Sequence, residues 1–176
     1  MHDLNKGFGR IEISLKWDPS PAGRPATDLD IVAAPYPVSD PYGDPAYVVH
    51  FDSRSPDGTI TLNRDSTDGL GLGFDEVMTV ELDRMHERYA RVVVGVVIQQ
   101  QSPLTFAGVS RPGLRIREGY DVLSESDFSG VPGATAAVVA EFRREGTGPW
   151  EADFAIRGFD EDPATFTRVM GAARRP

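Results

Sequence analysis

The chain contains no cysteine among its 176 residues, which excludes disulfide bonds, thiolate metal sites and a cysteine nucleophile. It also has no run that approaches the roughly 18 consecutive apolar residues of a membrane span. The opening residues, Met1 to Lys6, lack the apolar segment of a signal peptide. We therefore expect a cytoplasmic protein without a membrane span.

Positive charge is scarce in this sequence. Lys and Arg number 18 against 27 Asp and Glu, so the formal net charge is −9 at pH 7. This balance argues against a surface that binds nucleic acid and favours cations or basic partners. The length is most simply that of a single domain spanning residues 1–176, large enough to bury a core without disulfide or metal staples.

Known catalytic motifs are also missing. The three histidines, His2, His50 and His86, lie far apart without ligand spacing, and no Gly-x-Ser-x-Gly elbow is present. The glycine run at 69–73 lacks the Lys-Ser/Thr pair of a phosphate-binding loop. Paired carboxylates could support glycoside hydrolysis, but the acidic loop offers only Phe74 to stack on a sugar. None of these residue patterns therefore points to catalysis.

Apolar residues alternate with polar ones through most of the chain, which is the spacing of half-buried strands. Gly, Pro and Asp cluster between these segments and predict turns. The continuous apolar run at 92–98 is typical of the most central strand. The predicted strands cover 11–17, 28–34, 47–51, 59–63, 78–82, 92–98, 104–109, 114–117, 136–142 and 150–156.

Only the C-terminal end has helical spacing. Asp162 can cap a helix that begins at Pro163, a residue suited to the first helical position. Phe166, Val169, Met170 and Ala173 then recur at i, i+3, i+4 and i+7. About ten short strands and one terminal helix predict an all-β fold, an antiparallel β-sandwich with a short C-terminal helix.

The stretch from Asp65 to Glu76 is the feature that points to chemistry. It places Asp65, Asp68, Asp75 and Glu76 together with three glycines after a short predicted strand. Calcium takes six to eight oxygen ligands, and glycines let backbone carbonyls turn toward an ion. An Asp/Gly-rich loop can also be a solvated turn. Strands rather than helices flank this one, and Leu70 stands where an EF-hand needs glycine, so an EF-hand is excluded.

Asp28 and Asp30 can complete the same site from another segment. They lie two residues apart in a predicted strand, so their carboxylates project from one face. We therefore predict a calcium site with candidate ligands in two segments: Asp28, Asp30, Asp65, Asp68, Asp75 and Glu76.

These segments resemble the TerD-like tellurium-resistance and stress-response family, in four places that keep the family's order. The Asp28-Leu29-Asp30 strand is similar to that family's Asp-Leu-Asp strand, and Leu15 to Asp18 to the strand end before it. The run from Ser55 to Gly58 matches its Ser-Pro-Asp-Gly turn. Asp65 to Glu76 matches its acidic loop in length and glycine register. The stretches from Phe106 to Ile116 and from Tyr120 to Ser124 resemble its later strands.

The resemblance implies a cytoplasmic, calcium-binding β-sandwich linked to tellurite resistance and general stress, without an established enzymatic activity. Asp28, Asp30, Asp65, Asp75 and Glu76 fall on the family's acidic positions, whereas Asp68 is an additional acid where the family usually has Thr.

Several residues depart from the family pattern. Phe74 replaces an acid, Leu70 and Leu72 stand where acids are common, and Arg64 replaces a glycine. Each change makes the site less negative, so we expect weaker calcium binding than in a fully acidic member. Two functions follow: a non-enzymatic calcium-binding stress protein that acts through protein partners, or a metal-independent protein-interaction module with a degenerate loop.

Overall fold

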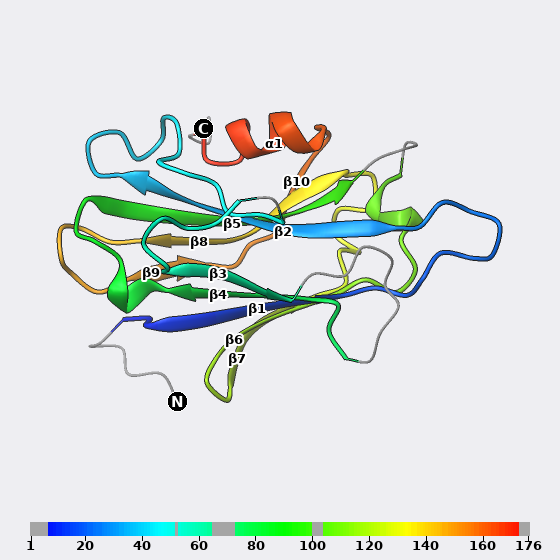
Figure 1. Cartoon of the computed structure of the whole chain (residues 1–176), viewed down its shortest axis with the longest axis horizontal. Helices are drawn as coiled ribbons and strands as arrows, with labels where there is room; N and C mark the ends of the chain where they lie inside the picture. The colour runs from blue at the N-terminus through cyan, green and yellow to red at the C-terminus, as the bar shows by residue number, and fades with distance from the viewer. Residues whose placement is uncertain (1–6, 52, 65–72, 100–103, 173–176) are drawn as a thin grey trace.

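Two antiparallel sheets stack face to face in the computed structural model (Figure 1), which describes residues 7–51, 53–64, 73–99 and 104–172. Sheet A has the strand order β3-β4-β1-β6-β7, and sheet B has the order β10-β8-β5-β2, with β9 paired to β8. The strands of sheet A are β1 (Arg10–Lys16), β3 (Ile60–Arg64), β4 (Glu76–Glu81), β6 (Gly113–Glu118) and β7 (Asp121–Ser126). Those of sheet B are β2 (Asp28–Pro37), β5 (Tyr89–Gln99), β8 (Ala136–Arg143), β9 (Glu151–Asp153) and β10 (Arg157–Phe159).

The main core lies between the two sheets. Ile11, Ile13 and Leu15 of β1 face it from sheet A, and Leu29 and Ile31 of β2 face it from sheet B. All five side chains have no solvent exposure. The alternation seen in the sequence therefore selects the buried face of each strand, as the period of two requires.

A second, smaller core covers the opposite face of sheet B. There the helix α1 (Pro163–Val169), drawn above the sheet in Figure 1, packs Phe166 against Val93 and Val138. Gly95 makes room for that ring, because a Cβ atom at this position would lie 2.6 Å from Phe166 Cε2. The two layers of apolar residues explain why β5 reads as a continuous apolar run: both of its faces are covered.

The predicted all-β fold, with two antiparallel sheets and one short C-terminal helix, is confirmed. The run at 92–98 lies inside β5, which is flanked by β8 and β2. Asp162 caps α1 as predicted, since Thr165 N donates to Asp162 Oδ1 at 2.8 Å and Pro163 occupies the first helical position. This hydrogen bond and one from the Thr165 hydroxyl lower the pKa of Asp162.

Three local predictions are wrong. Residues 47–51 do not form a strand: only Val49 and His50 make isolated bridges, to Ala33 and Ser53. Residues 104–109 contain the short 3-10 helix η2 (Phe106–Gly108) instead of a strand. The segment predicted as one strand at 150–156 ends early at β9, and β10 follows as an additional strand. In each case a short apolar run fits more than one structure, and tertiary contacts decide.

In the part of the chain that the structure describes, no helix is long and apolar enough to cross a membrane.

Candidate metal centre

The strand β2 places Asp28 and Asp30 on one face, as the sequence predicts. This face also carries Val32 and Ala34, which belong to the small core under α1, whereas Ile31 faces the core between the sheets. Asp30 is 1% exposed, and Asp28 is half-buried. Because β2 is the last strand of sheet B, both acids lie at an edge of the sandwich, and β2 there contacts β4 of sheet A.

Asp75 and Glu76 enter from sheet A, at the beginning of β4. Asp75 is 2% exposed and Glu76 is fully buried. The backbone N–H of Asp75 donates to the carbonyl of Leu15 at 2.9 Å, which fastens the start of β4 to β1. The carboxylate of Asp75 turns back to β1 and accepts from Trp17 N through Oδ2, also at 2.9 Å.

Glu76 connects the two sheets. Its Oε1 accepts a hydrogen bond from the backbone N–H of Ile31 at 2.6 Å. Ile31 follows Asp30 directly, so this bond brings the Glu76 carboxylate to the segment of β2 that carries the predicted ligands. The two acidic segments of the sequence, 45 residues apart at this contact, therefore meet at the edge of the sandwich.

Both acidic segments carry carboxylate oxygens that are shielded from solvent. Four carboxylate oxygens, one each from Asp28, Asp30, Asp75 and Glu76, have almost no contact with solvent. Asp75 Oδ1 accepts no hydrogen bond from the residues that the structure describes. A buried ionised carboxylate costs several kcal/mol unless donors or a cation compensate it, on the order of the penalties known for buried ions. The chemistry of this set therefore fits a hard cation that binds oxygen.

The site is only partly described. Asp65 and Asp68 lie outside the described residues, as do Leu70 and Leu72. Within the described ranges, no three His, Asp or Glu side chains are close enough together to hold a metal ion. Sharing of one ion by Asp28, Asp30, Asp75 and Glu76 therefore stays a prediction.

Phe74 points away from Glu76. The guanidinium of Arg115 lies 4.5 Å from the centroid of its ring, and Lys16 Nζ lies 5.8 Å from it. In the strand alternation, Lys16 and Arg115 lie on the outer face of sheet A, opposite Leu15 and Leu114 in the core. Phe74, which replaces a family acid, thus makes cation–π contacts with Arg115 and Lys16.

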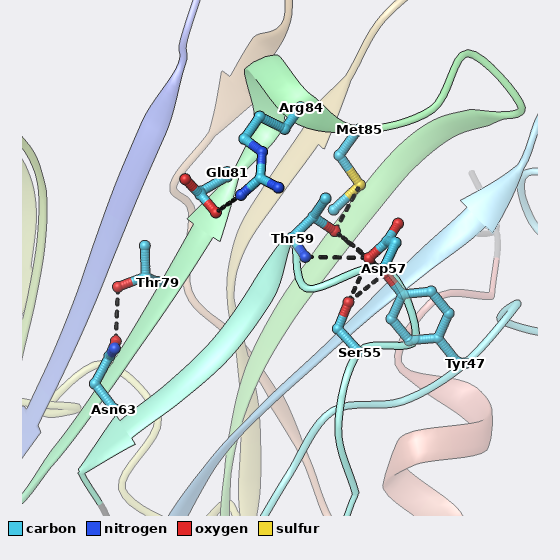
Figure 2. A network of polar contacts seen from close by, with 9 residues as sticks. All are labelled: Tyr47, Ser55, Asp57, Thr59, Asn63, Thr79, Glu81, Arg84 and Met85. Carbon is cyan, nitrogen blue, oxygen red and sulfur yellow. Dashed lines mark hydrogen bonds and ion pairs between the residues drawn. The ribbon is translucent and has the colours of Figure 1, made fainter.

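The Ser-Pro-Asp-Gly turn has a structural role that the sequence did not reveal. Figure 2 shows Asp57 at the centre of a network in which Oδ1 accepts from Thr59 N at 3.1 Å, Thr59 Oγ1 at 2.7 Å and Tyr47 OH at 3.2 Å. Ser55 Oγ donates to the same oxygen at 2.5 Å. Burial raises the pKa of Asp57, but these hydrogen bonds outweigh burial and leave the pKa below 3.8. The network fixes the turn into β3.

Other groups at the centre are backbone atoms. The N–H groups of Trp17 and Ile31 donate to carboxylates, and no side-chain pattern marks such donors in a sequence. The indole of Trp17 is 2% exposed and donates to the carbonyl of Thr27 at 2.9 Å, whereas its backbone N–H is the group that contacts Asp75.

Fold and site together define an antiparallel β-sandwich with buried carboxylates at one edge, where the two sheets meet. The model of the TerD domain matches residues 1–166, and the chain belongs to the TerD family.

Two solved structures are similar over nearly the whole chain. One is a crystal structure of SAV2460, described as a protein of unknown function, with 65% sequence identity and a TM-score of 0.94 over 96% of this chain and 100% of that chain. The other, SCO6318 from Streptomyces coelicolor, is described as a homologue of the telluride resistance protein TerD. It has 51% identity and a TM-score of 0.92, again over 96% of this chain and 100% of that chain. Among proteins with curated descriptions, none matches.

Proposed function

We propose that this protein is a non-enzymatic, calcium-binding stress-response protein of the tellurium-resistance type, which acts in the cytoplasm through protein partners. The observation that carries the proposal is the burial of Asp30, Asp75 and Glu76 where β2 and β4 meet. Membership of the TerD family and similarity to a homologue of a telluride resistance protein support the link to tellurium resistance.

The roles of the chain's own groups follow from their contacts. Trp17 N donates to one oxygen of Asp75, and Ile31 N donates to one oxygen of Glu76; these hydrogen bonds orient the two carboxylates. Asp28 and Asp30 are the candidate ligands from β2, and Asp65 and Asp68 are those from the loop. Bound calcium would supply the positive charge that neutralises the cluster.

Calcium is the expected ion for this set of ligands. All candidate ligands are carboxylates and backbone carbonyls, so no imidazole or thiolate favours zinc. Magnesium is smaller and gives up its water reluctantly, which makes it a poorer match for a site built from protein oxygens. Competition between the three ions at neutral pH checks this preference. Tighter binding of zinc than of calcium would show that the ligand set is wrong.

The experiment is a calorimetric titration of chelator-stripped protein with calcium chloride, together with thermal melts in chelator and in calcium. Calcium that binds only the folded state stabilises it by about 2.7 kcal/mol at a hundred times the dissociation constant. We therefore expect the melting temperature to rise with calcium concentration. Asp121→Asn, which changes an exposed acid on β7, is the matched control and should keep the full calcium response.

A second function competes with the first. The departures at Arg64, Leu70, Leu72 and Phe74 reduce the negative charge of the loop, and this favours a metal-independent module that contacts other proteins. A melting temperature that is the same in chelator and in millimolar calcium would reject calcium binding and leave the interaction module as the better explanation.

A further inference from the structure

The stack around Phe74 lies directly beside the candidate metal centre. Phe74 precedes Asp75, and its ring contacts cations from two neighbouring strands, Lys16 of β1 and Arg115 of β6. These strands are adjacent in sheet A, which Figure 1 shows along the lower side of the sandwich. Cation–π contacts at such distances are attractive, and the shorter one, to Arg115, is 4.5 Å.

Asp75 is fastened on the other side by hydrogen bonds. Its N–H donates to the carbonyl of Leu15, and its Oδ2 accepts from Trp17 N. Gly73, two residues before Asp75, has φ +78, a conformation that glycine adopts without strain. The chain thus turns at Gly73, fixes a ring on the outer face of sheet A, and then places a carboxylate at the sheet edge.

A ligand that is already in place loses less conformational entropy when the ion binds, so preorganisation tightens binding. The ring of Phe74 cannot itself ligate calcium, because it offers no oxygen. Its contribution must therefore act through its neighbour Asp75.

We propose that Phe74, held by its contacts with Arg115 and Lys16, is a positioning residue that keeps the Asp75 carboxylate in place for the cation and thereby raises calcium affinity. This proposal rests on the proposed calcium function. It also predicts the result of restoring an acid at this position. In Phe74→Asp the new carboxylate would lie beside Arg115 and Lys16 on the outer face and pair with them, so calcium affinity does not rise.

The test compares calcium dissociation constants of the full chain, measured by calorimetry with calcium chloride as the probe. Phe74→Leu keeps an apolar side chain and both cations but removes the aromatic ring. We expect its calcium affinity to fall by about threefold to tenfold, the effect of ordering one additional group. Phe74→Tyr keeps the ring and should bind within about twofold of the unmodified protein.

The matched control is Tyr42→Leu. The guanidinium of Arg91 lies 4.5 Å from the centroid of the Tyr42 ring, the same distance as between Arg115 and Phe74. This contact is remote from the candidate metal centre, because Arg91 pairs with Tyr36, which lies eight residues along β2 from Asp28. We expect this variant to bind calcium as the unmodified protein does. Melting in chelator is recorded for every variant, since a purely structural defect lowers the melting temperature without a selective loss of affinity.

The outcomes separate the two proposals. If the unmodified protein binds calcium and Phe74→Leu binds it equally well, the positioning role is wrong while the calcium function stands. Equal losses in Phe74→Leu and Phe74→Tyr, or tighter binding by Phe74→Asp, also overturn the positioning role. If the unmodified protein does not bind calcium at all, the calcium function fails and the affinity role fails with it.

Discussion

The buried ion pair between Arg91 and Glu141 offers the sharpest test of how sheet B is held together. Arg91 Nε donates to Glu141 Oε1 at 2.8 Å, and the two side chains are only 3% and 8% exposed. Arg91 also donates to the carbonyls of Pro41 and Gly171, and so links β5 to a loop and to the end of the helical segment. Its guanidinium lies 5.1 Å from the ring of Tyr36.

Replacing Arg91 by Met leaves the carboxylate of Glu141 buried without its main partner. Loss of one member of a buried pair costs about 3–5 kcal/mol, because the remaining charge keeps its desolvation penalty. For a chain of this length about 4 kcal/mol corresponds to a fall in melting temperature of roughly 8–16 °C. Glu141→Leu should cost a similar amount, on the order of 3 kcal/mol.

The double variant decides whether the pair acts as a unit. With both charges removed, no uncompensated ion remains, so Arg91→Met combined with Glu141→Leu should be at least about 2 kcal/mol more stable than the sum of the single losses predicts. Urea unfolding followed by circular dichroism measures all four free energies of unfolding. Additive losses would refute the reasoning.

An exposed pair provides the control. Arg84 Nη1 lies 2.7 Å from Glu81 Oε2, as close as the buried pair, but the two side chains are 60% and 23% exposed. Water screens such a pair, so Arg84→Met should cost less than about 1 kcal/mol. A loss as large as that of Arg91→Met would show that burial is not the cause.

Three further predictions concern the centre, the turn and the helix. If the two segments share one ion, Asp30→Asn should weaken calcium binding, measured by calorimetry, about as much as Asp65→Asn does. If Asp30→Asn binds calcium normally while Asp65→Asn does not bind it, the site is confined to the loop. Because the pKa of Asp57 is lowered in the folded state, its stabilisation is present above the unfolded value of 3.8 and is lost as the pH falls through the folded value. The stability difference from Asp57→Asn, about 1 kcal/mol at neutral pH after allowance for exposure, should therefore shrink below about pH 4 in urea titrations, and a constant difference would contradict the assignment. Gly95→Ala should lower the free energy of unfolding by about 1–3 kcal/mol, because the added methyl group overpacks against Phe166. Phe166→Leu should restore part of this stability in the double variant. A melting temperature of Gly95→Ala equal to that of the unmodified protein would disprove the close fit.

The fold class followed from local pattern. The alternation at 11–17 and the continuous apolar run at 92–98 each specify one arrangement of buried faces, and the Asp162-Pro163 pair specifies where α1 begins. Short apolar runs at 47–51 and 104–109 were misassigned, because a bridge, a 3-10 turn and a strand bury similar residues over so few positions.

The acidic residue types and their spacing were also visible in the sequence, since hard cations need oxygen ligands and two acids at i and i+2 share a face of a strand. The sequence predicted that the two acidic segments share a site, but the contact through which β2 and β4 meet was not visible. It depends on the packing of two sheets, which brings Glu76 to Ile31 across 45 positions of sequence. Two further contacts depend on neighbouring strands in the same way. Trp17 N donates to Asp75, and the ring of Phe74 packs against Arg115. Local spacing thus determined the strands and the candidate ligands, whereas only the tertiary structure decided which carboxylates are buried and what holds them.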